Sequence, residues 1–134
     1  CTHTYLEILI GPVERQSNMK HFELSEFDSP DKVGSGENML PSFLEKIDLA
    51  RDISQVPYKI NSGYRTKDHN QAINGSLTSS HLIGVACDIH CTDSHSRERI
   101  VYGLIKAGFT RIGIAKTFIH ADTDSSKNPA LWLY

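Results

Sequence analysis

The 134-residue sequence contains only three cysteines, one tryptophan and five prolines, and its charges nearly cancel to a formal net charge of −2. Small secreted domains stabilised by disulfides usually have an even number of cysteines, so three cysteines do not indicate such a domain. The near-neutral charge offers no broad electrostatic basis for binding nucleic acid or an anionic membrane surface. No apolar run approaches the about 20 residues that a transmembrane helix needs. We therefore expect a soluble, monomeric protein with no nucleic-acid partner and no membrane span.

The composition is ordinary for a globular protein, with 39% hydrophobic and 22% charged residues. The length corresponds to about one domain with one sizeable core. Residues 1–18 differ from the rest of the chain, because Gly11-Pro12 interrupts them and a polar stretch, Glu14–Asn18, closes them. We expect residues 1–18 to be an N-terminal extension or leader and residues 19–134 to be the folded domain. The apolar stretch near the start is too short for a signal peptide, so synthesis in the cytoplasm is expected.

Apolar residues at helical spacing predict two long helices. The first covers Pro41–Ser54, with a proline that suits the first helical turn. The second is capped by Ser94 or Ser96 and stopped by Gly108. A short helix is expected directly after Thr66, whose hydroxyl suits an N-cap.

Alternating apolar and polar residues predict strands at Val85–His90, Thr110–Ile114 and Thr117–Asp122. The helices and strands are mixed without the strict alternation of a doubly wound sheet. We therefore expect a single α+β domain with a small, mostly antiparallel sheet flanked by helices. The final residues, Trp132–Tyr134, are expected to return to the core.

Two of the expected strands carry polar side chains on one face. Asp88 shares a face with His90 in one strand, and His120 shares a face with Asp122 in another. Such polar groups need partners, because burying them unpaired is costly. His81 lies seven residues before Asp88. Since two imidazoles and one carboxylate are a known ligand set for catalytic zinc, the hypothesis is that His81, Asp88 and His120 converge on one Zn²⁺.

Simpler interpretations stay open at this point. Seven histidines in 134 residues make some histidine–aspartate pair at any given separation expected by chance. Residues seven apart also share a helix face, so His81 and Asp88 could be surface groups of a helix. Gly84 weakens that alternative, because glycine costs about 1 kcal/mol in a helix. Cys87 faces away from Asp88 in the expected strand, and we interpret it as a core residue rather than a zinc ligand.

Three blocks of the sequence carry a resemblance to a known family. They are Ser62-Gly63-Tyr64-Arg65-Thr66, then Ser80-His81-x₂-Gly84-x-Ala86-x-Asp88, then Phe118-Ile119-His120-Ala121-Asp122. From about Met19 to Tyr134 the chain resembles the zinc D-alanyl-D-alanine carboxypeptidase family. That family also includes vancomycin-resistance D,D-dipeptidases and phage L-alanyl-D-glutamate endopeptidases, and its fold resembles the hedgehog signalling domain.

The resemblance implies roles for individual residues. His81, Asp88 and His120 match the zinc ligands. Arg65 matches an arginine that faces the substrate, where its guanidinium suits a carboxylate or a developing oxyanion. The alternative for Arg65 is a salt bridge without a role in catalysis. Ser80 is expected to hold substrate or orient a ligand, and the alternative is a hydroxyl that caps a loop.

The general base is where the sequence departs from the family. Relatives commonly carry an acidic residue or histidine a few residues before the last ligand, whereas here Ala115–Phe118 fills that stretch. Asp122 is the expected catalytic base in its place. An equal alternative is that Asp122 orients the imidazole of His120, a frequent arrangement around zinc. His90 is a weaker candidate for the base.

The function implied is that of a zinc-dependent peptidase that hydrolyses peptidoglycan stem-peptide amide bonds. The D-Ala-D-Ala carboxypeptidase and L-Ala-D-Glu endopeptidase types both stay open, and action at the bacterial cell wall is expected. One alternative is a cell-wall or protein binding module that keeps zinc without turnover, favoured by the unclear identity of the base. Another is a metal-free structural protein whose histidines lie in its core.

Overall fold

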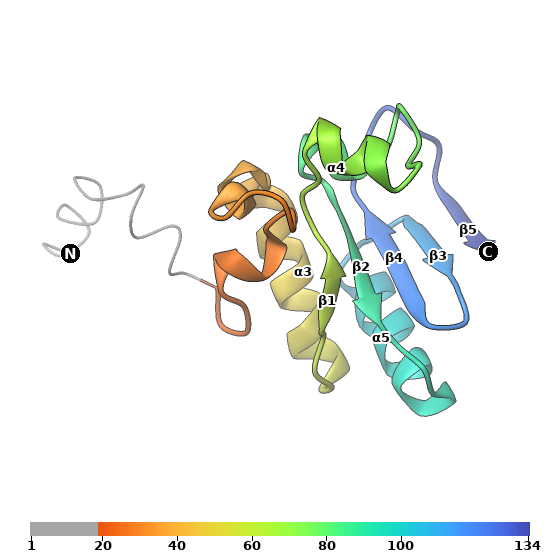
Figure 1. Ribbon diagram of the computed structural model, residues 1–134. Coiled ribbons are helices and arrows are strands. Elements are labelled where there is room, and N and C mark those ends of the chain that lie inside the picture. The colour runs from red at the N-terminus through yellow and green to blue at the C-terminus, as the bar shows by residue number, and fades with distance from the viewer. Residues whose placement is uncertain (1–18) are drawn as a thin grey trace, which may run out of the picture.

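Two helices, α3 (Pro41–Ser54) and α5 (Ser94–Lys106), pack against each other behind a five-stranded sheet (Figure 1). The computed structural model describes residues 19–134, so the expected extension at residues 1–18 lies outside the described part of the chain. Both long helices are confirmed, and Pro41 occupies the first turn of α3 as its fixed φ favours. Asp93 caps α5 by accepting a hydrogen bond from the backbone N–H of Ser96. The N-cap is therefore Asp93 and not the expected Ser94 or Ser96.

The sheet has the strand order β1-β2-β4-β3-β5. Its strands are β1 (Ile60–Ser62), β2 (Ala86–His90), β3 (Arg111–Ile114), β4 (Phe118–Asp122) and β5 (Ala130–Leu133). Neighbouring strands are antiparallel except for β3 and β5, which run parallel. The expected α+β architecture with a mostly antiparallel sheet is confirmed.

The two faces of the sheet differ in chemistry because side chains alternate along each strand. The face toward α3 and α5 is apolar and completely buried where β2 and β4 pair: Cys87, Ile89, Ile119, Ala121. Cys87 is therefore the core residue that the strand pattern predicted. The opposite face carries the charged side chains of β2, β3 and β4, and these form the candidate site.

Short helices and turns fix the segments that lead into the sheet. Helix α4 (Lys67–Ala72) begins after Thr66, whose hydroxyl accepts a hydrogen bond from the backbone N–H of His69. The 3-10 helix η3 (Ser80–Ile83) ends at Gly84, which adopts the left-handed φ of +74° that favours glycine. A side chain at Gly84 would also meet the backbone of Asn38. This turn sets the direction in which the chain enters β2.

Two further 3-10 helices, η1 (Leu24–Phe27) and η2 (Ser35–Asn38), pack against each other ahead of α3. They lie beside the β1 edge of the sheet (Figure 1). Phe27 of η1 is fully buried in the core, and its backbone carbonyl accepts a hydrogen bond from the N–H of Tyr64, just after β1.

The C-terminal residues differ from the expectation. Trp132–Tyr134 were expected in the core, but Leu133 is 79% exposed and Tyr134 is 67% exposed. The physical reason is that β5 is the outermost strand and pairs only with β3. Trp132 instead lies on the same sheet face as His120, with its ring centroid 5.5 Å from the imidazole.

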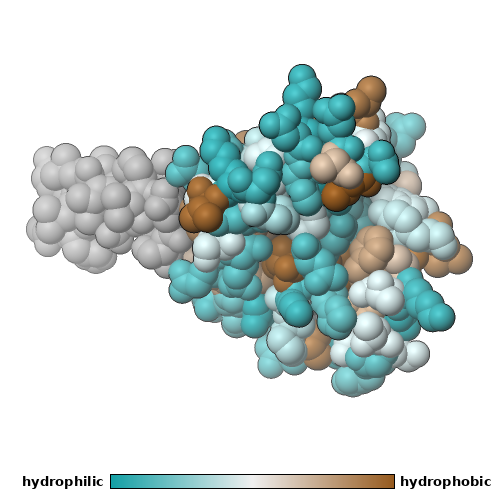
Figure 2. Space-filling view, viewed as in Figure 1, coloured by the Kyte–Doolittle hydropathy of each residue, from teal (hydrophilic) through white to brown (hydrophobic). Residues whose placement is uncertain are grey.

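The outer surface is mainly polar on the side seen in Figure 2, where apolar residues are scattered rather than gathered. None of the helices in residues 19–134 is both long enough and apolar enough to cross a membrane.

Candidate metal centre

Four residues, one on each of four neighbouring strands, lie side by side in a row across the sheet. Asp88 on β2 pairs with His120 on β4, which pairs with Gly113 on β3, which pairs with Trp132 on β5. The row places one aspartate and one histidine, 32 residues apart in sequence, directly opposite each other. The strand register therefore supplies two of the three expected ligands.

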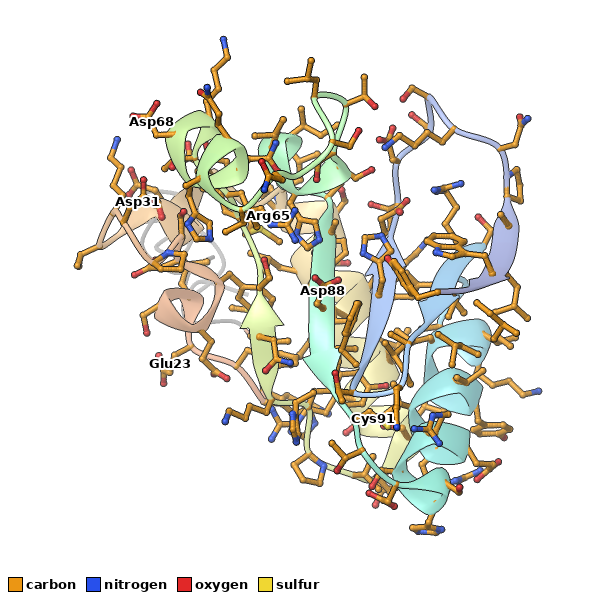
Figure 3. The ribbon with its side chains drawn as sticks, turned by 45° about the vertical axis from the view of Figure 1, so that its right-hand side comes forward. Glu23, Asp31, Arg65, Asp68, Asp88 and Cys91 are labelled. Carbon is orange, nitrogen blue, oxygen red and sulfur yellow. The ribbon has the colours of Figure 1, made fainter. Side chains whose placement is uncertain are left out.

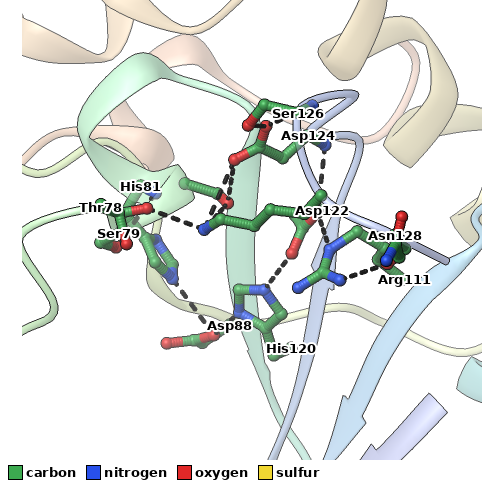
Figure 4. A network of polar contacts seen from close by, with 12 residues as sticks. Thr78, Ser79, His81, Asp88, Arg111, His120, Asp122, Asp124, Ser126 and Asn128 are labelled. Atoms are coloured by element: carbon green, nitrogen blue, oxygen red, sulfur yellow. Dashed lines mark hydrogen bonds and ion pairs between the residues drawn. The ribbon is translucent and has the colours of Figure 1, made fainter. Parts of the chain in front are cut away.

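The third expected ligand, His81, reaches the same point from η3. Its Nε2 lies 3.4 Å from Oδ1 of Asp88, and the same oxygen lies 2.9 Å from Nδ1 of His120. The ligand atoms of these three residues all lie within 4.8 Å of one another (Figure 4). The expected convergence of His81, Asp88 and His120 is thus present in the structure.

Each histidine is held by a hydrogen bond on the ring nitrogen that faces away from Asp88. Nδ1 of His81 lies 2.7 Å from the carbonyl oxygen of Gly63, and a carbonyl only accepts, so this nitrogen carries the proton. Nε2 of His120 lies 2.7 Å from Oδ2 of Asp122. The nitrogens that face Asp88, and that would bind a metal once they carry no proton, are therefore His81 Nε2 and His120 Nδ1. Two imidazole nitrogens and one carboxylate oxygen are a donor set that suits Zn²⁺.

The carboxylates and His120 form a strongly coupled group in the metal-free protein. Burial opposes the charge of Asp88, but hydrogen bonds from His120 and His81 outweigh it and hold the pKa of Asp88 well below its usual value. Burial also disfavours protonation of His120, yet its hydrogen bonds to Asp122 and Asp88 raise its pKa above 6.5. The carboxylates beside the His120 imidazole therefore stay negatively charged, and this negative charge suits a bound cation.

Asp122, the expected base, is only 1% exposed. Besides His120, it accepts hydrogen bonds from Nε of Arg111 at 2.8 Å and from the backbone N–H of Asp124 at 3.0 Å. Burial opposes its charge, but these contacts outweigh it and lower the pKa of Asp122. Because the carboxylate contacts the imidazole nitrogen opposite to the one that faces Asp88, the contacts favour the orienting alternative. The role as a base stays a prediction.

Arg65 lies beside the three candidate ligands. Its Nη2 is 3.4 Å from Oδ2 of Asp88, and both side chains are 13% exposed (Figure 3). Burial lowers the pKa of Arg65, but the guanidinium remains far from neutral at physiological pH. The structure therefore places this cation beside the candidate ligands, in a salt bridge with Asp88, and its contact with substrate stays a prediction.

Ser80 is buried next to His81, but its hydroxyl is already engaged. Oγ donates to Oδ2 of Asp124 at 2.7 Å and accepts from Nζ of Lys127 at 2.9 Å. These contacts connect the segment after β4 to η3. A contact between Ser80 and substrate stays a prediction. His90, the weaker candidate, is exposed and lines a separate cavity with Lys59.

The candidate ligands line an open cavity of about 360 Å³. Its lining also includes the polar residues Arg65, Ser76 and Ser79. Three aromatic residues that contact one another line it as well: Phe118, Trp132, Tyr134. A cavity of this size admits part of a peptide chain.

Three residues of this region were not singled out from the sequence. Arg111 supports Asp122 and also lies over the Trp132 ring, with 4.9 Å between guanidinium carbon and ring centroid. Arg111 is a charged residue in an otherwise apolar strand and shares a face with Gly113. This position indicated that its side chain needs a polar partner. Asn70 of α4 accepts a hydrogen bond from Nη1 of Arg65. No sequence pattern indicated Trp132 or Asn70, because their contacts form only once β5 and α4 are in place.

The fold and the site together define an α+β domain with a candidate metal centre of two histidines and one aspartate. A family model described as Peptidase M15 matches residues 18–122, which include all three candidate ligands, and the chain belongs to that family. M15 peptidases are metallopeptidases, so this membership supports a peptidase that acts on a peptide substrate. No curated protein sequence matches the chain. The family resemblance inferred from the three sequence blocks is confirmed.

Proposed function

We propose that the protein is a zinc-dependent peptidase that hydrolyses amide bonds of peptidoglycan stem peptides. The observation that carries the proposal is the convergence of His81 Nε2, Asp88 Oδ1 and His120 Nδ1 in an open cavity. This donor set belongs to a chain of the M15 peptidase family. The D-Ala-D-Ala carboxypeptidase and L-Ala-D-Glu endopeptidase types are the two forms of the proposal, and the bacterial cell wall is the proposed place of action.

A zinc ion bound by these three residues would polarise the scissile carbonyl and lower the pKa of water toward about 7. The chain's own residues prepare the site for it. The Gly63 carbonyl fixes the tautomer of His81, and Asp122 fixes that of His120. Arg65 lines the cavity and supplies a positive charge for a substrate carboxylate or for the oxygen of the attacked carbonyl.

Proton transfer is assigned to Asp122 as the working proposal. Among the residues that line the cavity, only Asp88 and Asp122 are carboxylates. Asp88 is a candidate ligand, so Asp122 is the remaining acidic group. Acting as a base would require its carboxylate to exchange the hydrogen bond with His120 for one with water. Ser80 is also proposed as a substrate contact, which requires its hydroxyl to exchange the hydrogen bond with Asp124 for one with substrate.

A second candidate function is a zinc-retaining module that binds cell-wall material or a protein without turnover. The observation that favours it is that both oxygens of Asp122 are engaged by His120, Arg111 and the backbone N–H of Asp124. A site without a free base would still bind zinc and peptide.

The test is incubation of the zinc-loaded protein with purified peptidoglycan, followed by mass spectrometry of the released fragments. Peptidase function predicts release of terminal D-Ala or cleavage between L-Ala and D-Glu, abolished by His81→Ala. His95→Ala is the matched control, because His95 is exposed and lies outside the site. Full zinc occupancy with no cleavage would support the binding module and reject the peptidase.

A further inference from the structure

The guanidinium of Arg65 is held by side chains from four separate segments. Nε donates to Oγ of Ser62 at 3.1 Å, and Nη1 donates to Oδ1 of Asn70 at 3.3 Å and to Oγ of Ser79 at 3.5 Å. Nη2 donates to Oδ2 of Asp88 at 3.4 Å. A guanidinium is planar with donors in a fixed fork, so contacts along its edges set where the remaining donor points.

The two oxygens of Asp88 have different partners. Oδ1 faces the candidate ligand nitrogens of His120 and His81, at 2.9 and 3.4 Å. Oδ2 faces Nη2 of Arg65. A carboxylate can bind a metal through one oxygen or through both. The guanidinium beside Oδ2 occupies one lone pair of this oxygen and offsets its charge, so Oδ2 competes less well for a metal than Oδ1.

Asn70 is the buried residue that fixes one edge of the guanidinium. It is 3% exposed, and its Nδ2 donates to the backbone carbonyl of Ser76 at 2.9 Å. That bond determines which end of the amide carries the oxygen toward Arg65. Gly75 packs directly against the amide, where a side chain would overlap the Asn70 group. The orientation of Asn70 is therefore set by its own surroundings and not by Arg65 alone.

We propose that Asn70 is a positioning residue that aims Arg65 at Asp88, so that Asp88 binds the metal through Oδ1 alone. The inference rests on the metal centre of the proposed function and adds how its coordination is limited. With one oxygen from Asp88 and one nitrogen from each histidine, three protein ligands are supplied, and the rest of the coordination is left to solvent and substrate. If both oxygens of Asp88 bound the metal, fewer coordination positions would remain for solvent and substrate.

The test replaces zinc with Co²⁺ and records visible absorption per bound ion, together with the bound Co²⁺ per chain. This absorption is strong for four ligands and weakens as ligands are added. Arg65→Ala frees Oδ2 of Asp88, so we expect a loss of intensity at unchanged stoichiometry. Asn70→Ala should cause a smaller loss in the same direction. Asn38→Ala is the matched control, because the Asn38 amide bonds only the Ser35 carbonyl and lies away from the site.

A second variant guards against a folding defect in Asn70→Ala. Gly75→Ala keeps every hydrogen-bonding group but places a methyl group against the Asn70 amide, and it should reproduce the loss of intensity. Circular dichroism checks that each variant is folded.

The possible outcomes separate the inference from the proposed function. Wild-type absorption in Arg65→Ala at full Co²⁺ content would overturn the one-oxygen restriction while leaving the metal centre standing. A loss in Arg65→Ala, with unchanged spectra in Asn70→Ala and Gly75→Ala, would overturn the positioning role of Asn70. Absence of stoichiometric Co²⁺ in the wild-type protein would reject the metal centre and the inference with it.

Discussion

Nδ1 of His120 lies 2.9 Å from Oδ1 of Asp88, and the two residues are directly opposite each other on β4 and β2. A slip of one residue in this pairing would turn over the side chains of one strand relative to the other, so that Asp88 and His120 would lie on opposite faces of the sheet. That slip is prevented by the fully buried Ile119 and Ile89, which are also paired and face the helices. The apolar core therefore sets the geometry of the polar site.

Asp122→Asn separates the two roles considered for Asp122. If Asp122 orients His120, the substitution weakens that hydrogen bond, and zinc affinity should fall about 10–100-fold. If Asp122 is the base, zinc affinity stays near the wild-type value while turnover falls by about 10²–10⁴. The contacts lead us to expect the loss of affinity. Competition with a chelator measures it, and Asp93→Asn, an exposed helix cap, is the control.

Ser80→Ala tests whether the Ser80 hydroxyl serves the fold or the substrate. Removing it leaves the buried Asp124 without one of its hydrogen bonds, which should lower the free energy of unfolding by about 1–3 kcal/mol. Urea denaturation measures the loss, and Ser125→Ala, at an exposed neighbour, should show little change. Unchanged stability together with a raised KM for peptide would instead assign Ser80 to substrate binding.

Gly113→Ala should displace Trp132 from its place beside His120. A Cβ at position 113 would lie 2.6 Å from the indole, closer than the two groups can approach. Overpacking of this kind typically costs about 1–3 kcal/mol, which denaturant unfolding can measure. In a Trp132→Ala background the added methyl group has room, so the same substitution should cost little there. An equal cost in both backgrounds would show that Trp132 does not need the glycine.

The pH dependence of zinc binding should follow the protonation of His120. Burial disfavours its charge, but Asp122 and Asp88 outweigh burial and raise the pKa of His120 above 6.5 in the metal-free protein. Protonated His120 therefore stabilises the metal-free fold. This stabilisation is fully present below about pH 6.5 and is lost as pH rises through the raised pKa. Zinc competes with that proton, so affinity should weaken as pH falls through the same raised pKa.

Zinc titrations across a pH series check this prediction, with release of protons on binding as a second readout. Asp122→Asn removes one of the two carboxylates that favour protonated His120, so it should move the loss of affinity to lower pH. An affinity that is constant down to pH 6.5 in the wild-type protein would be inconsistent with the raised pKa.

The long helices and the paired strands β2 and β4 were predictable because their apolar periodicity is local. Pro41–Ser54 was predicted with its observed ends, and the Val85–His90 strand was predicted to within one residue. The same alternation correctly put Asp88 and His120 on faces opposite to buried residues. With the resemblance to a zinc family, this was enough to predict the three candidate ligands.

The supporting contacts were not predictable from local pattern. Arg111 reaches Asp122 only because β3 pairs with β4 in one register, and Trp132 reaches His120 only because β5 adds in parallel to β3. The apolar residues near the C-terminus suggested burial, but an outermost strand leaves Leu133 exposed. Asn70 and Arg65 are only five residues apart, but they meet because α4 begins between them, and no apolar periodicity indicates that contact.

The most direct test of the metal centre is the zinc content of the purified, zinc-loaded protein after removal of free metal, measured by elemental analysis. We predict about one zinc ion per chain in the wild-type protein and in His95→Ala, and loss of that ion in His81→Ala and His120→Ala. A wild-type protein that retains no zinc, or one whose zinc content is unchanged by both ligand substitutions, would contradict the account.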